Sequence, residues 1–167
     1  MHDPVLESTS LQQSGETQQL QQTLEMQQIR QLPVSTLAYI GDAYYELWVR
    51  RRLLSFIVAK SGDLHHLTVK LVNATFQAAL VRQWQKEDIL DLDEEAIFLR
   101  GRNGNPGAMA KHADPVDYRL ATGLETLVGY LYLSNKLGRL NTLLQPEIDR
   151  AILQMKVNKY GNTKLQP

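Results

Sequence analysis

The chain has 167 residues, of which 43% are hydrophobic and 22% charged, so it is long enough for one globular domain with a sizeable core. It contains no cysteine, which excludes disulfides, thiolate zinc sites and cysteine nucleophiles. No apolar run approaches the roughly 20 residues of a membrane span, and the first residues lack the pattern of a secretory signal or transit peptide. We therefore expect a cytoplasmic protein without a membrane partner.

Residues 1–31 are rich in glutamine and contain few aliphatic side chains. Such a segment buries too little apolar surface to offset the entropy lost when it becomes ordered. We expect residues 1–31 to form a flexible N-terminal arm with a short transient helix over Gln18–Arg30. The folded domain is expected over residues 32–167, because Pro33, Ser35 and Thr36 are typical of a helix start.

The first predicted helix runs from about Ser35 to Phe56. Its sequence LAYIGDAYYELWVRRRLL has no proline, and five of its apolar residues follow helical spacing, namely Leu37, Ile40, Tyr44, Leu47 and Trp48. Gly41 is unusual in a helix, where glycine costs about 1 kcal/mol relative to alanine. Asp42 and Glu46 are four residues apart, so both carboxylates point from roughly the same side, away from the apolar stripe.

The remaining apolar segments also predict helices. In chain order these cover residues 61–84, residue 93 to the breaker LRGRNGNPG, and residues 117–135, 140–144 and 146–159. An exposed loop is expected from Asn103 to Pro115, and Gly138 marks a break. Because no segment alternates convincingly with period two, strands are not expected. The sequence predicts an all-α helical bundle.

The helix over residues 117–135 has an apolar stripe of Leu120, Leu124, Leu127 and Leu131. Thr122, Glu125 and Gly129 lie on another side. Two helices thus combine a carboxylate with an interior glycine.

Glycines allow two backbones to approach closely, so these helices could cross with Asp42 and Glu125 facing each other. Two such carboxylates on a rigid bundle suit a hard cation such as Mg²⁺, which can activate water at a phosphodiester. The residues alone leave an alternative open, in which the acids form salt bridges and the glycines serve packing only.

Two of these segments resemble a known family. LAYIGDAYYEL and TGLETLVGYLYL are similar to the two metal-ligand helices of the ribonuclease III catalytic domain, and LRGRN with YRLAT is similar to its short form, Mini-ribonuclease III. That form has no separate domain for binding double-stranded RNA. The resemblance covers about Leu32 to Leu144 and implies the ribonuclease III endonuclease-domain fold. It also implies a magnesium-dependent endoribonuclease whose catalytic and metal-binding residues are Asp42 and Glu125.

The chain also departs from full-length ribonuclease III. Three acids of the longer enzymes are replaced here by Ser35, Ala38 and Thr122, as is typical of the Mini-ribonuclease III branch. The resemblance therefore implies fewer protein ligands, with water or RNA oxygens completing the magnesium shell. It assigns supporting positions to Glu46, Thr122, Gly41 and Gly129.

The resemblance further implies a homodimer in which two sites face one RNA duplex and leave 5′-phosphate and 3′-hydroxyl ends. The usual substrate of the family is a precursor of large-subunit ribosomal RNA, so ribosomal particles or proteins are further candidate partners. Duplex RNA is recognised mainly by shape and by backbone contacts, and a basic loop suits that task. The candidate RNA-binding residues are Arg100, Arg102, Asn103, Lys111, His112 and Arg119.

Two alternatives stay open. The missing acids at Ala38 and Thr122 would also fit a catalytically silent ribonuclease III-like domain that binds RNA or a ribosomal particle. A helical nucleotide pyrophosphohydrolase is the other alternative, but it would need a denser array of acids, such as a run of E-x-x-E, than this chain has.

Overall fold

The computed structural model describes residues 25–104 and 114–160, with side chains up to residue 156. The chain divides into two compact units, Met1–Leu32 and Pro33–Pro167. In the first unit, residues 25–31 are helical. The rest of the expected flexible arm, residues 1–24, lies outside the described residues, so the arm stays a prediction.

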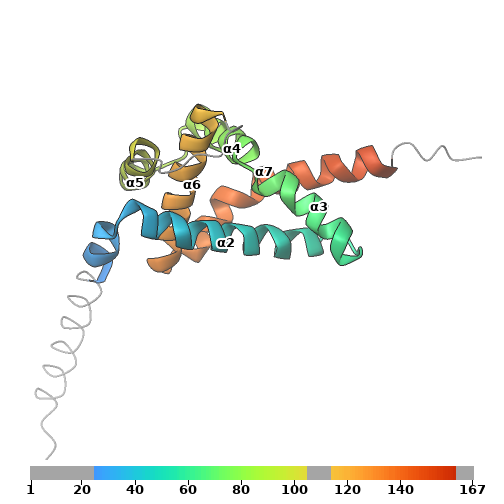
Figure 1. Ribbon diagram of the computed structural model, residues 1–167, viewed down its shortest axis with the longest axis horizontal. Coiled ribbons are helices and arrows are strands. Elements are labelled where there is room, and N and C mark those ends of the chain that lie inside the picture. The colour runs from blue at the N-terminus through green and yellow to red at the C-terminus, as the bar shows by residue number, and fades with distance from the viewer. Residues whose placement is uncertain (1–24, 105–113, 161–167) are drawn as a thin grey trace, which may run out of the picture. The chain divides into compact units, whose positions relative to one another are not determined.

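The described part of the second unit contains helices and no strand, which confirms the predicted all-α class (Figure 1). The helices are α2 (Val34–Leu54), α3 (Ser61–Val72), α4 (Ala74–Glu87), α5 (Leu92–Asn103), α6 (Pro115–Leu133) and α7 (Leu137–Tyr160). All six begin or end within a few residues of a predicted boundary. The predictions differ from the structure at Asn73, where a helix ends, and at Pro146, where a helix continues.

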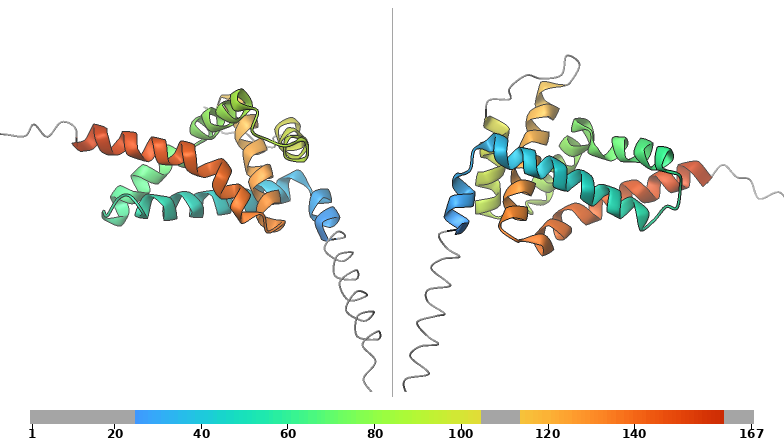
Figure 2. Two further views of the ribbon diagram at one scale, coloured as in Figure 1. Left: turned by 180° about the vertical axis from the view of Figure 1, so that it is seen from behind. Right: turned by 60° about the horizontal axis from the view of Figure 1, so that its bottom comes forward.

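Helix α6 is the centre of the bundle. It packs against α2, α4, α5 and α7, and the two views of Figure 2 show it crossing α2 and lying between the other helices. Its predicted apolar stripe is buried, and so are residues on its other sides, including Ala121, Gly123, Thr126 and Val128. From Leu120 to Leu131, α6 is apolar on most of its sides, with Glu125 as its one charged residue. Such a helix belongs in a core, which accounts for the position of α6.

The buried side of α2 differs from the predicted stripe. Leu37 and Trp48 are buried as expected, but the side chain of Leu47 is 57% exposed and Tyr45 is fully buried in its place. The side of α2 that contains Leu37, Gly41 and Tyr45 faces α6, because the two helices approach each other at Gly41. Leu47 points elsewhere, so its assignment to the core was wrong.

The single helix predicted over residues 61–84 is wrong, because Asn73 divides it into α3 and α4. The backbone of Asn73 is extended, with φ −76° and ψ 157°. Its side-chain oxygen accepts a hydrogen bond from the Phe76 amide at 2.9 Å, and its Nδ2 donates to the carbonyl of Val69 at 2.9 Å. One asparagine therefore caps both helices, a role that this side chain fills well.

The two short helices predicted near the C-terminus are one helix, α7, with Pro146 inside it. Proline in a helix removes one hydrogen bond and costs about 3 kcal/mol. Helix α7 offsets this cost by burying a continuous line of side chains on both sides of Pro146, namely Leu140, Leu143, Leu144, Ile148 and Ile152. The chain breaks before Gly138, at Asn135, which has a positive φ of 57°.

Polar contacts fix the helices that lead to α6. Asp91 forms a capping box with Glu94 at the start of α5. The Glu94 carboxylate is buried and accepts two hydrogen bonds from Arg139 of α7, both at 2.8 Å. Asp114 caps α6 by accepting from the amides of Val116 and Asp117. Residues 105–113 of the expected loop lie outside the described residues.

Candidate active site

Helices α2 and α6 make backbone contact at two glycines. A Cβ atom at Gly41 would lie 1.7 Å from the carbonyl oxygen of Glu125, and a Cβ atom at Gly129 would lie 2.0 Å from the carbonyl oxygen of Leu37. No side chain fits in either space. The two glycines are therefore required for this crossing, as the sequence suggested.

The crossing brings Asp42 and Glu125 to the same place. Asp42 follows Gly41 on α2 and is exposed, whereas Glu125 lies one turn before Gly129 on α6 and is mostly covered. Neither carboxylate forms a salt bridge with the lysines and arginines that the structure describes. Among the described lysines and arginines, these two acids therefore have no counter-charge.

The electrostatics of the two acids reflect that missing charge. Burial and, to a smaller extent, the nearby charge of Asp42 raise the pKa of Glu125, while the neighbouring Gln77 amide lowers it; together they bring it to about 7. Burial and the charge of Glu46 also raise the pKa of Asp42. Each carboxylate is thus less stable when ionised than it would be in water. A bound cation would relieve this cost.

The donor set fits a hard divalent cation. Carboxylate oxygens are the ligands that Mg²⁺ prefers, and such an ion keeps several waters when one or two carboxylates bind it. Within residues 25–104 and 114–156, no cluster of three His, Asp or Glu side chains surrounds a potential ion site. Asp42 and Glu125 would therefore be the only acidic ligands from the described chain, which agrees with the small ligand set expected from the sequence.

The other two predicted supporting residues engage neighbours on their own helices. Glu46 forms an ion pair with Arg50, one turn further along α2. The Thr122 hydroxyl donates to the Tyr118 carbonyl at 3.0 Å, although Thr122 lies one turn before Glu125. Neither the Glu46–Arg50 ion pair nor the Thr122 hydrogen bond involves Asp42 or Glu125. Their supporting roles stay predictions.

Sequence reasoning missed Gln77 and the position of Tyr45 beside the acids. Gln77 of α4 is buried, and its amide lies close enough to Glu125 to lower the pKa of that carboxyl. Tyr45 is also buried, its hydroxyl donates to the Leu71 carbonyl at 2.9 Å, and the charge of Glu125 contributes to raising its pKa. A polar residue among Ala74, Ala78 and Val81 on the apolar side of α4 was the signal that could have identified Gln77.

The candidate RNA-binding residues surround the junction of α5 and α6. Arg100, Arg102 and Asn103 lie at the C-terminal end of α5, and Arg119 is exposed on α6. Lys111 and His112 lie outside the described residues. The end of α5 is held against α6 by another close contact, since a Cβ atom at Gly101 would lie 2.4 Å from the Thr126 hydroxyl.

Comparisons with known proteins agree with this architecture. The model of the ribonuclease III domain matches residues 35–136. A crystal structure of a protein from Fusobacterium nucleatum, 27% identical in sequence, superposes with a TM-score of 0.63 over 70% of this chain and 93% of that one. The family match and the fold thus define a ribonuclease III-type domain, whose members are metal-dependent endoribonucleases of double-stranded RNA and usually act as dimers.

Similar sequences identify the family within the ribonuclease III class. A Mini-ribonuclease 3 of Symbiobacterium thermophilum is 43% identical over 118 residues, covering 71% of this chain and 89% of the relative. A Mini-ribonuclease 3 of Enterococcus faecalis is 40% identical over 69% of this chain and 87% of the relative. The chain belongs to the Mini-ribonuclease III family, and the predicted family, fold class and endoribonuclease activity are confirmed. Among the described residues, no helix has the length and apolarity needed to cross a bilayer.

Proposed function

We propose that this protein is a magnesium-dependent endoribonuclease in which Asp42 and Glu125 hold the ion and perform the catalysis. The observation that carries the proposal is the acid pair at the α2–α6 crossing, which has no salt-bridge partner among the described lysines and arginines. The proposed substrate is a duplex stem in a precursor of large-subunit ribosomal RNA, free or within a ribosomal particle. The bacterial relatives fit a cytoplasmic location.

When bound at this pair, Mg²⁺ supplies an activated water and neutralises charge at the phosphodiester. Asp42 is exposed and presents its carboxylate to the incoming RNA backbone. Glu125 is recessed behind it, where burial strengthens its interaction with a cation. Gly41 and Gly129 fix the separation of the two helices, and hence of the two acids. The products carry 5′-phosphate and 3′-hydroxyl ends.

The RNA duplex is proposed to contact the surface beside the acids. Arg100, Arg102, Asn103 and Arg119 are polar or charged residues near the ends of α5 and α6 that border residues 105–113, which include Lys111 and His112. Contacts of such residues with phosphates provide affinity that does not depend on sequence. Shape recognition of this kind suits a duplex.

A homodimer would present two such sites to one duplex. The surface of α2 near Asp42 supports it, because Tyr39 is 77% exposed, Leu47 57% and Leu54 60%. Tyr39 and Leu47 are two turns apart on one side of the helix, and Leu54 follows two turns later. An apolar face of this kind on a soluble helix marks an interaction site, and a second copy of the chain is the proposed occupant.

The experiment is cleavage of an end-labelled RNA duplex in a Mg²⁺ titration. Asp42→Asn and Glu125→Gln should each abolish cleavage or lower its rate by about 100-fold or more, the scale on which one electrostatic group acts in an active site. Glu147→Gln is the matched control, because Glu147 pairs with Arg150 on α7 and is unrelated to the acid pair.

Retained cleavage in the Asp42→Asn variant would contradict the assignment. RNA that stays intact with the unmodified protein at every Mg²⁺ concentration would instead favour the silent, RNA-binding alternative.

A further inference from the structure

Gln77 is a buried amide next to the acid pair. It lies in the first turn of α4 with only 1% of its surface exposed, which is unusual for glutamine. Its Nε2 donates to the Val72 carbonyl at the end of α3, at 3.3 Å, and the side chain lies close enough to Glu125 to lower the pKa of that carboxyl. A buried polar group with a carboxylate as partner requires an explanation beyond packing.

The contacts fix the orientation of the amide. An amide nitrogen has two hydrogens, and the two acceptors here are the Val72 carbonyl and the Glu125 carboxylate. If the positions of Nε2 and Oε1 were exchanged, the amide oxygen of Gln77 would face another acceptor, the Val72 carbonyl oxygen, and the two would repel each other. The amide oxygen, Oε1, is buried and accepts no hydrogen bond from the described residues.

Several hydrogen bonds fix the backbone around Gln77, at the junction of α3 and α4. The Asn73 carbonyl accepts from the backbone N–H of Gln77 at 3.1 Å, and the side chain of Asn73 caps both α3 and α4. The Leu71 carbonyl, beside Val72, accepts from the buried Tyr45 hydroxyl of α2 at 2.9 Å. The end of α3 is thus tied to α2 and α4 on either side of Glu125.

From these contacts we propose that Gln77 is the positioning residue of the active site, holding the Glu125 carboxylate in the orientation that binds the cation with Asp42. This inference rests on the proposed function of the acid pair. Partners that hydrogen-bond to metal ligands orient them, and their loss typically lowers metal affinity or activity 10- to 100-fold. Gln77 contacts the ligand and not the reacting phosphate.

The test is Mn²⁺ binding to the RNA-free protein, measured from the electron paramagnetic resonance signal of free Mn²⁺. Gln77→Met keeps the length of the side chain but removes both donors, and should weaken Mn²⁺ binding about 10-fold or more. Gln83→Met is the matched control, because Gln83 lies on the same helix and its side chain donates to Glu87, one turn further along α4. It should bind Mn²⁺ like the unmodified protein.

Circular dichroism and Tm verify folding of each variant. If Gln77→Met does not fold, Gln77→Asn is used, which keeps the amide but withdraws it from Glu125 by one methylene; it should lose affinity too. Unchanged Mn²⁺ binding in a folded Gln77 variant, with binding lost in Asp42→Asn, overturns the inference and leaves the proposed function standing. Unchanged binding in Asp42→Asn overturns both. An equal loss in Gln83→Met overturns the inference, since it would show a general effect of altering α4.

Discussion

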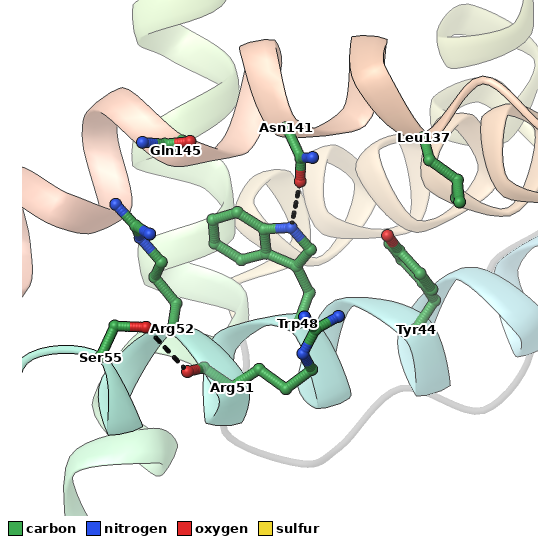
Figure 3. Close-up of a pocket in the computed structure, with 8 residues that line it drawn as sticks. All are labelled: Tyr44, Trp48, Arg51, Arg52, Ser55, Leu137, Asn141 and Gln145. Carbon is green, nitrogen blue, oxygen red and sulfur yellow. Dashed lines mark hydrogen bonds between the residues drawn. The ribbon is translucent and has the colours of Figure 1, made fainter.

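The two sides of α2 differ in whether their charged side chains have a partner of opposite charge. One side presents Asp42 beside Glu125, with no described lysine or arginine paired to either acid. The other side borders a cavity of about 290 Å³ between α2 and α7, where Trp48 donates to the Asn141 side chain at 2.8 Å (Figure 3). Arg52 also lines this cavity, and its guanidinium pairs with Asp149 of α7.

The difference separates binding from stability. The Arg52–Asp149 ion pair joins α2 to α7, so each of these two charges neutralises the other. The acid pair between α2 and α6 costs stability in the absence of a cation, because both pKa values are raised. Such a loss of stability is typical of functional sites, and a cation bound between the two carboxylates would offset it. Substitutions on each side of α2 test this difference.

Gly41→Ala should have the largest effect. The added methyl group would lie 1.7 Å from the Glu125 carbonyl oxygen, so α2 and α6 must separate. We expect a loss of more than about 3 kcal/mol in the free energy of unfolding, above the usual cost of overpacking, although alanine is intrinsically better in a helix by about 1 kcal/mol. Chemical denaturation measures the change.

Gly62→Ala and Gly138→Ala are the matched controls, since nothing lies within 4 Å of a Cβ atom at either position. Each should be neutral or stabilise the protein by up to about 1 kcal/mol. A Gly41→Ala variant as stable as these two would show that the crossing is looser than the structure indicates.

The second prediction concerns pH and metal-free stability. The Glu125 carboxyl has a pKa of about 7 in the folded protein against 4.5 as a free side chain, so the folded state binds the proton more tightly. Stability therefore falls as pH rises from about 4.5 to 7, by at most about 3.5 kcal/mol at roughly 1.4 kcal/mol per pH unit. Glu125→Gln removes this loss, so in EDTA the variant should gain Tm over the unmodified protein between pH 5 and 8.

Added Mg²⁺ should stabilise the unmodified protein at pH 8 and leave Glu125→Gln nearly unchanged, because an ion stabilises only the state that binds it. Parallel Tm curves for the two proteins from pH 5 to 8 in EDTA would contradict the assigned pKa.

Much of the acid site was readable from sequence because it rests on local rules. A glycine inside a helix has a cost that only close approach explains, so Gly41 and Gly129 predicted the crossing that the structure shows. The apolar stripe of α6 followed from its helical spacing and is buried as predicted. Family resemblance then selected Asp42 and Glu125 from the acids of the chain.

The rest depended on contacts between distant segments. Gln77 looked like a polar interruption of α4, and only the fold places it against Glu125. Asn73 is compatible with a helix interior, and its capping of two helices requires the chain to turn there. Pro146 normally ends a helix, but burial on both sides of it outweighs that local preference.

The smallest predicted effect lies on the side of α2 that faces α7. Asp149→Asn removes the charge that Arg52 pairs with, and both side chains are partly exposed, at 20% and 26%. We expect a loss of about 1 kcal/mol in the free energy of unfolding, reduced at high salt, with cleavage unchanged well below Tm. Glu147→Gln, two residues away, disturbs an ion pair within α7 alone and should change stability by less than about 0.5 kcal/mol. If Asp149→Asn instead lowered the cleavage rate of folded protein more than Glu147→Gln does, the α7 side of α2 would contribute to activity. The separation of a binding side from a stabilising side would then be wrong.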